Sequence, residues 1–330
     1  MNIFGDDMKI VVSDPVFLPE EYRKRLEVLG NLTIFENMPS SIDEFISRVE
    51  DADIVIVGRY GFSEKVFLAT KNLKMISVWQ TGYGHININA ATKKGIAVSN
   101  VPDYAYDSVA EMVFALILNL ARKVHLADTG LRNGNFDWRN YIGYQLMGKT
   151  MGVVGIGSTG SRVIQIAHGF KMNVIAYTHH PNDKAANNLD IKFVDLDTLL
   201  KESDIISLHV PLTSETEHMI GTKEFERMKK SAILINTARG KIVDEDALII
   251  ALRDKQIGGA GLDVFEREPL PLNSLLLEFE NVALTPHVAF LSYESLDECT
   301  RVCVQNVEKF IEGKPQNVVN PETIASLKLP

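Results

Sequence analysis

The chain has 330 residues, 45% of them hydrophobic, and a net charge of −9 at neutral pH. This length exceeds what one hydrophobic core usually supports, so two domains of ordinary size are expected. The negative charge argues against a surface that binds nucleic acid or an anionic membrane, and it favours small-molecule partners. The first seven residues lack the basic region of a secretory signal, and the longest apolar run, at 112–118, is too short to cross a bilayer. A cytoplasmic protein is therefore expected.

The first hundred residues alternate short β-rich runs with helical patterns. Pro19 is placed for the first turn of a helix and Gly30 for its end. The alternation of strand and helix predicts a mostly parallel sheet with helices on both faces. The strands expected in this part are 8–13, 32–35, 53–57, 73–79 and 96–98, and the helices are 19–29, 42–49 and 89–94.

A long helix is predicted over 108–123, with Glu111 near its start and Arg122 and Lys123 at its end, as the helix macrodipole favours. Its length and apolar content indicate an interface. A polar stretch, 130–144, separates it from a second series of strands and helices. The strands expected in that series are 150–154, 175–177, 205–209, 232–236, 259–264 and 282–284.

These patterns predict an α/β fold of two doubly wound domains with parallel sheets. The second domain is expected to span residues 101–291, beginning near Asn100 and Pro102. The final predicted helix, 296–312, returns the chain to the first domain, which therefore comprises residues 1–100 and 292–330.

The first chemical signal is the run Gly155-Ile156-Gly157-Ser158-Thr159-Gly160, which follows a predicted strand and opens a helix predicted over 161–168. In this context the first glycine permits a tight turn and the second lets the backbone approach a pyrophosphate. The third glycine allows close helix packing, and the helix N-terminus supplies partial positive charge. The loop therefore predicts a site for NAD or NADP.

The residue that distinguishes the two dinucleotides is expected at the end of the next strand. Thr178 stands there, so no carboxylate is placed for a ribose 2′-hydroxyl, and His179 and His180 follow it. Either imidazole could meet a 2′-phosphate, whereas Asp183 or a backbone group could serve NAD instead. We expect a site that accepts NADP slightly in preference to NAD.

Three polar residues follow later strands, at the edge where open α/β sheets bind their ligands. Arg239 offers a planar fork for a carboxylate, and Glu268 and His287 come after the last two strands. Each of these residue types is usually solvated or structural when it is considered alone. Together they are candidates for a catalytic set.

Cys299 and Cys303 are the two cysteines of the chain and share one face of the final predicted helix. Two thiols are too few for a structural zinc site. We therefore expect no metal, and reduced thiols of the kind found in a cytosol.

The sequence resembles the D-isomer-specific 2-hydroxyacid dehydrogenases, a family that includes glyoxylate and hydroxypyruvate reductases, D-lactate dehydrogenases and phosphoglycerate dehydrogenases. The resemblance covers nearly the whole chain. It rests on the blocks Gly152–Gly160, His209–Thr213, Asn236–Gly240, Gly261–Phe265 with Glu268-Pro269, and Thr285–His287. It implies a flavodoxin-like substrate-binding domain, a Rossmann domain for NAD(P), and an active site in the cleft between them. The run 101–106 looks most like the glyoxylate and hydroxypyruvate reductase branch.

The resemblance also implies roles for single residues. Arg239 would anchor the substrate carboxylate, Glu268 would orient and charge the histidine, and His287 would be the general acid and base. Thr81 and Gly82 resemble the loop that holds the substrate carboxylate through backbone N–H groups. Further contacts are expected from Arg59 and Tyr104 to the substrate, and to the cofactor from Val109, Gly155, Gly157, Ser158, Thr159, Gly160, Thr178, His179, His180, His209, Val210, Pro211, Thr216, Thr237, Ala238, Asp263 and His287.

The expected reaction is reduction of a small 2-oxo acid by hydride from NAD(P)H, with His287 supplying the proton. A homodimer through the region 108–123 is also implied. Two other functions stay open. Phosphite dehydrogenases keep an Arg, Glu and His set, and a corepressor branch keeps the fold and binds dinucleotide but holds partner peptides. Formate dehydrogenases are disfavoured because they carry glutamine where this chain has Glu268.

Overall fold

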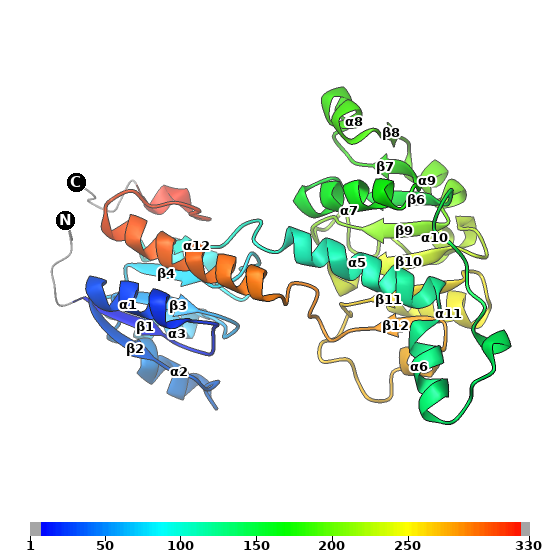
Figure 1. Cartoon of the computed structure of the whole chain (residues 1–330). Helices are drawn as coiled ribbons and strands as arrows, with labels where there is room; N and C mark the ends of the chain where they lie inside the picture. Colours follow the sequence, from blue (N-terminus) through cyan, green and yellow to red (C-terminus); the bar gives the residue numbers. More distant parts are fainter. Residues whose placement is uncertain (1–7, 325–330) are drawn as a thin grey trace. The chain divides into compact units, whose positions relative to one another are not determined.

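The computed structural model describes residues 8–324. The chain forms two compact units: the first contains the residues up to Tyr104 and those from Ser292 onward, and the second spans Ala105–Leu291. Each unit holds one parallel sheet (Figure 1). The predicted α/β fold of two doubly wound domains is confirmed.

The first unit has a five-stranded sheet. Its strands are β1 (Lys9–Val12), β2 (Asn31–Ile34), β3 (Ile54–Val57), β4 (Met75–Val78) and β5 (Ala97–Ser99), in the spatial order β2-β1-β3-β4-β5. Its helices are α1 (Glu20–Leu29), α2 (Ile42–Val49), α3 (Glu64–Ala69), α4 (Ile88–Lys93) and α12 (Tyr293–Ile311), with a short 3-10 helix η4 (Pro321–Thr323).

Successive residues of β1 enter different cores, because side chains alternate between the two faces of a strand. Ile10 and Val12 pack with apolar residues of α1 and α12, whereas Val11 packs with those of α2 and α3. Helices therefore cover both faces of this sheet, as buried apolar strands require.

The second unit has a seven-stranded sheet. Its strands are β6 (Thr150–Val154), β7 (Asn173–Tyr177), β8 (Lys192–Phe193), β9 (Ile205–Leu208), β10 (Ile233–Asn236), β11 (Gly259–Leu262) and β12 (Val282–Leu284), in the order β12-β11-β10-β9-β6-β7-β8. Its helices are α5 (Tyr106–Ala121), α6 (Val124–Arg132), α7 (Ser158–Gly169), α8 (Asp183–Leu189), α9 (Leu196–Glu202), α10 (Thr222–Arg227) and α11 (Glu245–Arg253), with 3-10 helices η1 (Trp138–Tyr141), η2 (Gly240–Ile242) and η3 (Leu275–Glu278). Helices α5 and α7 cover one face, and α9, α10 and α11 cover the other.

The strand order of each sheet reverses at one point. In the first unit this point lies between β1 and β3, and in the second between β6 and β9. Open α/β sheets bind their ligands at such a point, outside the carboxyl ends of the strands. A ligand-binding site is therefore expected at the loops that follow these four strands.

The long predicted helix corresponds to α5, which ends earlier than expected. Lys123 has a left-handed backbone with φ of 51°, and a side-chain-bearing residue in that conformation interrupts a right-handed helix. Helix α6 then begins and extends into the stretch that the sequence predicted to be irregular. No residue of α6 is buried, so its apolar side chains enter no core of the described residues.

Within residues 8–324, none of the helices combines the length and the apolar character that a membrane span needs. Over the same range, no group of three or more His, Cys, Asp or Glu side chains is arranged to hold a metal ion. Cys299 and Cys303 are buried and form no disulfide.

Candidate active site

The glycine loop joins β6 to α7 at the point where the sheet order reverses. Gly155 has φ of 92°, and a Cβ there would lie 2.7 Å from the carbonyl oxygen of His209, so only glycine fits. A Cβ at Gly160 would lie 2.1 Å from the carbonyl oxygen of Gly155, which shows how closely the helix packs on the turn. A Cβ at Gly157 would meet no other described atom within 4 Å. The backbone at Gly157 is therefore open to a ligand.

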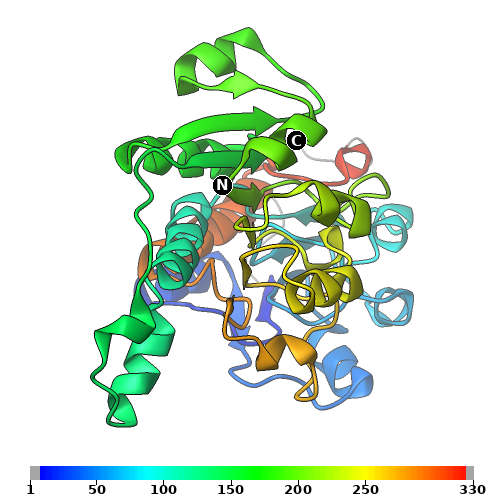
Figure 2. The same cartoon turned by 90° about the vertical axis from the view of Figure 1, so that its right-hand side faces the viewer.

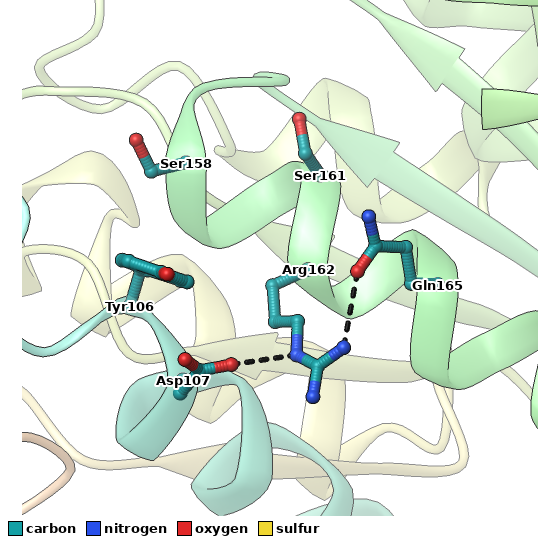
Figure 3. A pocket seen from close by; sticks show the side chains of 6 residues that line it. All are labelled: Tyr106, Asp107, Ser158, Ser161, Arg162 and Gln165. Carbon is teal, nitrogen blue, oxygen red and sulfur yellow. Dashed lines mark hydrogen bonds and ion pairs between the residues drawn. The ribbon is translucent and has the colours of Figure 1, made fainter. Parts of the chain in front are cut away.

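A cavity of about 400 Å³ opens beside the first turn of α7 (Figure 3). Its lining is polar and consists of Tyr106, Asp107, Ser158, Ser161, Arg162 and Gln165. The Nε atom of Arg162 lies 2.6 Å from Oδ1 of Asp107, and an Nη atom donates to Oε1 of Gln165 at 3.0 Å. The start of α7 supplies partial positive charge to the cavity, whereas the Arg162 guanidinium is paired with Asp107, which lines the same cavity.

The residues that were predicted to distinguish NAD from NADP follow the end of β7. Thr178 is half-buried, and His179 and His180 are exposed. The ring of Tyr177 meets that of His179 edge-on, with centroids 5.5 Å apart. Neutral and basic groups thus occupy the position where a ribose-binding carboxylate is expected in an NAD site.

The loop after β9 begins with His209, whose Nε2 lies 2.8 Å from the Ser207 hydroxyl. Burial lowers the pKa of His209 to about 4, so its imidazole is neutral near pH 7. Val210 and Pro211 follow it beside the glycine loop. The Thr216 hydroxyl, predicted to bind cofactor, donates to the Pro211 carbonyl at 2.6 Å and accepts from the Thr213 N–H at 2.8 Å. Thr216 thus shapes the loop and presents no free hydroxyl.

The turn after β10 is fixed by the buried side chain of Asn236. Its Oδ1 accepts from the Ala238 N–H at 3.0 Å, and its Nδ2 donates to the Arg239 carbonyl at 2.9 Å. The Arg239 side chain is exposed. The Thr237 hydroxyl is buried and finds no hydrogen-bond partner among the described residues. A buried unsatisfied hydroxyl costs about 1–3 kcal/mol, so this oxygen is suited to a ligand or a water molecule.

The loops after β10 and β11 touch at Gly240. A Cβ there would lie 1.9 Å from the carbonyl carbon of Phe265, so no other residue fits without displacing backbone. The loop that carries Arg239 therefore packs directly on the loop that carries Glu268.

Glu268 and His287 form a direct pair. Oε2 of Glu268 lies 2.6 Å from Nδ1 of His287, and Oε1 accepts from the Phe265 N–H at 3.1 Å. With Nδ1 occupied in this way, the other ring nitrogen, Nε2, is the atom available for proton transfer. Both side chains remain more than a third exposed, so a substrate can reach them.

Asp263 holds the segment that carries His287. Its carboxylate is fully buried and accepts from the Thr285 hydroxyl at 2.5 Å and from the N–H groups of Val288 and Ala289 at 2.9 and 2.8 Å. His287 itself has φ of 55°, an uncommon conformation that the surrounding bonds must maintain. The resemblance implied a cofactor contact for Asp263, which stays a prediction; in the structure its two oxygens hold this segment.

Four predicted substrate contacts lie in the first unit, after the carboxyl ends of its strands: Arg59, Thr81, Gly82 and Tyr104. The Thr81 hydroxyl donates to the Val101 carbonyl at 2.7 Å, which ties the loops after β4 and β5 together. The Arg59 side chain is exposed on the loop after β3. Tyr104 is half-buried against the core beside α12.

Residues 114–289 match the family model described as D-isomer specific 2-hydroxyacid dehydrogenase, NAD binding domain. The chain belongs to the D-isomer-specific 2-hydroxyacid dehydrogenase family. It is 44% identical over 323 residues to a glyoxylate reductase of Thermococcus litoralis, covering 94% of this chain and 96% of the relative. It is 36% identical over 322 residues to a hydroxypyruvate reductase of Blautia hydrogenotrophica, covering 95% and 100%.

Solved structures agree with this assignment. A D-lactate dehydrogenase from Aquifex aeolicus, complexed with NAD and lactic acid, superposes with a TM-score of 0.80 at 33% identity, covering 96% of this chain and 98% of the other. An acyclic imino acid reductase, Bsp5, in complex with NADPH and D-Arg gives a TM-score of 0.86 at 35% identity, covering 94% and 100%. The dehydrogenase therefore uses NAD or NADP for hydride transfer.

Features of the second unit fit such a dinucleotide. The open backbone at Gly157 and the start of α7 suit the pyrophosphate, and the unpartnered Thr237 hydroxyl lies after β10, close to the switch in strand order. The sequence did not predict that Asp263 accepts hydrogen bonds from the segment that carries His287. The two residues are far apart in sequence, and no local pattern marks a carboxylate that accepts from a distant loop.

Proposed function

We propose that this dehydrogenase reduces a small 2-oxo acid, such as glyoxylate or hydroxypyruvate, to the D-2-hydroxy acid. The observation that carries the proposal is the contact of 2.6 Å between Glu268 and Nδ1 of His287. The names of the relatives in Thermococcus litoralis and Blautia hydrogenotrophica support this substrate class.

The bound NAD(P)H supplies the hydride. Glu268 holds Nδ1 of His287 and so orients the ring, which leaves Nε2 as the atom that transfers a proton. In reduction this proton goes to the substrate oxygen as the carbonyl becomes a hydroxyl. Arg239 binds the carboxylate and so orients the carbonyl carbon. Thr81, Gly82, Arg59 and Tyr104 are the further substrate contacts that we propose.

The test is an assay of the purified enzyme with NADPH or NADH and a series of 2-oxo acids: glyoxylate, hydroxypyruvate, pyruvate and longer homologues. We expect oxidation of the cofactor with the small members. Turnover of phosphite with NAD or NADP instead would favour a phosphite dehydrogenase. Tight dinucleotide binding without turnover of any of these compounds would favour the corepressor-like function.

For the cofactor we propose a slight preference for NADPH, supported by Thr178, His179 and His180. Replacing Thr178 with Asp should lower kcat/KM with NADPH by about tenfold or more, because the new carboxylate repels a 2′-phosphate. The value with NADH should hold or rise, since the carboxylate can accept from the 2′-hydroxyl. Steady-state kinetics with both cofactors measures the ratio.

The matched control for this change is Asp183→Asn, which alters an exposed carboxylate close by in the chain. If Asp183 serves NAD, this control will weaken NADH binding and Thr178→Asp will leave the cofactor ratio unchanged. That pair of results would contradict the proposed preference.

We also propose a homodimer, with an interface that includes α6 and the segment after it. The apolar face of α5 is already buried against α7 and the sheet. By contrast α6 and the following segment project from the second unit in both views (Figures 1 and 2). Their exposed large hydrophobic side chains are Val124, Leu131, Phe136, Trp138, Ile142, Tyr144 and Met147. Such a patch marks an interaction surface.

Replacing Phe136 and Trp138 together with serine should convert the dimer to a monomer of 36.8 kDa, because this change removes the largest exposed apolar groups of the segment. Light scattering after size-exclusion chromatography measures the mass. Leu272→Ser is the control, since Leu272 is 97% exposed outside the segment. A monomeric wild-type enzyme, or a double variant that stays dimeric, would contradict the proposal.

A further inference from the structure

A buried carboxylate in the first unit binds the loop that carries Arg59. Asp14 follows β1 directly and is fully buried. Its Oδ1 accepts from the Gly58 N–H at 2.9 Å, and its Oδ2 accepts from the N–H groups of Arg59 and Tyr60 at 2.6 and 3.1 Å. The Ser13 hydroxyl donates to Oδ1 at 2.9 Å. Three successive backbone donors of one loop thus converge on one carboxylate.

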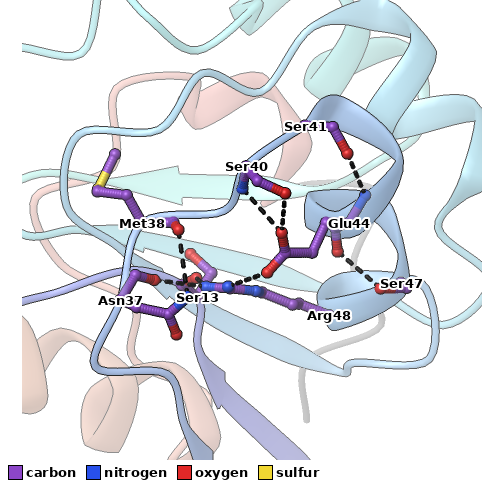
Figure 4. A network of polar contacts seen from close by, with 8 residues as sticks. All are labelled: Ser13, Asn37, Met38, Ser40, Ser41, Glu44, Ser47 and Arg48. Atoms are coloured by element: carbon purple, nitrogen blue, oxygen red, sulfur yellow. Dashed lines mark hydrogen bonds and ion pairs between the residues drawn. The ribbon is translucent and has the colours of Figure 1, made fainter.

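The segment that precedes Asp14 is itself held from α2 (Figure 4). Arg48 is buried, and its guanidinium donates to the carbonyl oxygens of Ser13 at 2.9 Å and Asn37 at 2.7 Å. Glu44 forms an ion pair with this guanidinium and also accepts from Ser40 at 2.8 Å. Asp14 therefore has a fixed base from which to hold the neighbouring loop.

The remaining side chains of the loop are turned into the unit. Tyr60 stacks on Phe45 with centroids 4.2 Å apart, and the side chain of Phe62 is fully buried. The Phe62 N–H donates to the His85 carbonyl at 3.0 Å. Arg59 is the exposed side chain between these anchors, and its guanidinium has no hydrogen bond or ion pair within residues 8–324.

The loop that carries Arg59 lies where the strand order of the first sheet reverses. Asp14 follows β1 and Gly58 follows β3, and these are the two strands between which the order of the first sheet reverses. Ligands of open α/β sheets bind at this point. A guanidinium without a partner within residues 8–324, on a backbone held by Asp14, is suited to an anionic substrate, since the loop backbone loses little freedom on binding.

We infer that Asp14 is a positioning residue for substrate binding, which acts by holding the backbone of Gly58, Arg59 and Tyr60 so that Arg59 meets the 2-oxo acid. This inference rests on the proposed function. Arg59 would contact the substrate carboxylate, the group of glyoxylate that does not react, so its contribution appears in KM more than in kcat. Asn in place of Asp14 offers one acceptor oxygen where the native residue offers two, and the loop loses part of its anchor.

The experiment measures KM and kcat for glyoxylate and hydroxypyruvate with NADPH in Asp14→Asn, Arg59→Gln and the double variant. We expect KM to rise about tenfold in each single variant, with kcat within about twofold and NADPH affinity unchanged. In the double variant KM should equal that of Arg59→Gln, because Asp14 acts through Arg59.

Asp53→Asn is the matched control. Asp53 accepts from the Lys9 N–H at 2.9 Å and pairs with Lys74, but it precedes β3 and so lies at the opposite edge of the same sheet. It should lower the melting temperature without a change in KM. If Asp14→Asn does not fold, Gly58→Ala tests the same hydrogen bonds. The added Cβ would lie 3.0 Å from Oδ2 of Asp14 and would therefore disturb them.

Each other result overturns the inference. A wild-type KM in Asp14→Asn, an equal rise in Asp53→Asn, or additive effects in the double variant would each reduce Asp14 to a structural role. A wild-type KM in an active Arg59→Gln variant would show that neither Arg59 nor Asp14 contributes to substrate binding. Failure of the proposed function is distinct from these results, because the wild-type enzyme would then turn over neither 2-oxo acid.

Discussion

Replacing His287 with Ala should abolish turnover and leave dinucleotide binding intact. The proton on the imidazole is the one that the substrate oxygen receives, and general acid catalysis of this kind contributes about 10²–10⁴-fold to a rate. His287 lies beyond β12, outside the glycine loop, so the pyrophosphate site is untouched. Stopped-flow hydride transfer measures the chemical step, and quenching of protein fluorescence measures NADPH affinity.

Two further variants sharpen this test. Glu268→Gln keeps one acceptor oxygen where the native residue has two, on Nδ1 of His287 and on the Phe265 N–H, so a smaller loss is expected than for His287→Ala. His125→Ala is the control, since His125 bonds to Asn119 and the Glu280 carbonyl. If His287→Ala kept near-normal hydride transfer, the assignment of the general acid would be wrong.

Replacing Asp263 with Asn should lower kcat by about 10²-fold, since small displacements of a catalytic group are costly. The carboxylate accepts from the Thr285 hydroxyl and from the N–H groups of Val288 and Ala289 through its two oxygens, whereas Asn keeps only one acceptor oxygen, so part of this set of bonds is lost. The uncommon backbone of His287 then loses part of its support, although its own N–H still donates to the Asp263 carbonyl. Unfolding should also become easier by about 1–3 kcal/mol, which thermal or chemical denaturation measures.

Asp204→Asn separates positioning from a general loss of stability in this second test. Asp204 lies in the same unit and accepts from the Thr150 N–H at 2.9 Å and from Lys229 at 3.0 Å, but it precedes β9 at the other edge of the sheet. It should cost stability and leave kcat unchanged. Equal losses of kcat in the Asp204 and Asp263 variants would show that Asp263 has no specific role.

Much of the fold could be predicted because its signals are local. Buried parallel strands are short apolar runs, and the residues that end them, such as Gly155 and Arg239, stand out against those runs. The catalytic candidates followed from the same reasoning, since they come after strands whose ends share one edge of the sheet. Helix α6 was not predicted because it begins after Lys123 without a capping side chain and without an acidic residue in its first turn, the signals that mark a helix start.

The supporting contacts could not be predicted in the same way. Asp14 and Asp263 each accept from backbone groups of a loop that is distant in sequence, and any residue can supply such an N–H. The fixed hydroxyl of Thr216 likewise depends on how its loop closes. A sequence pattern can place a carboxylate after a strand, but the partner of that carboxylate is decided only by tertiary packing.

The contact at Gly240 limits how the loops that carry Arg239 and Glu268 can diverge in evolution. The Cα of Gly240 leaves no room for a methyl group against Phe265, so the turn bearing Arg239 and the turn bearing Glu268 share one boundary. A larger residue there would shift both turns together. New substrate specificities are therefore expected to arise more easily in loops outside this junction. There a single substrate-binding residue can change while the Glu268–His287 pair keeps its geometry.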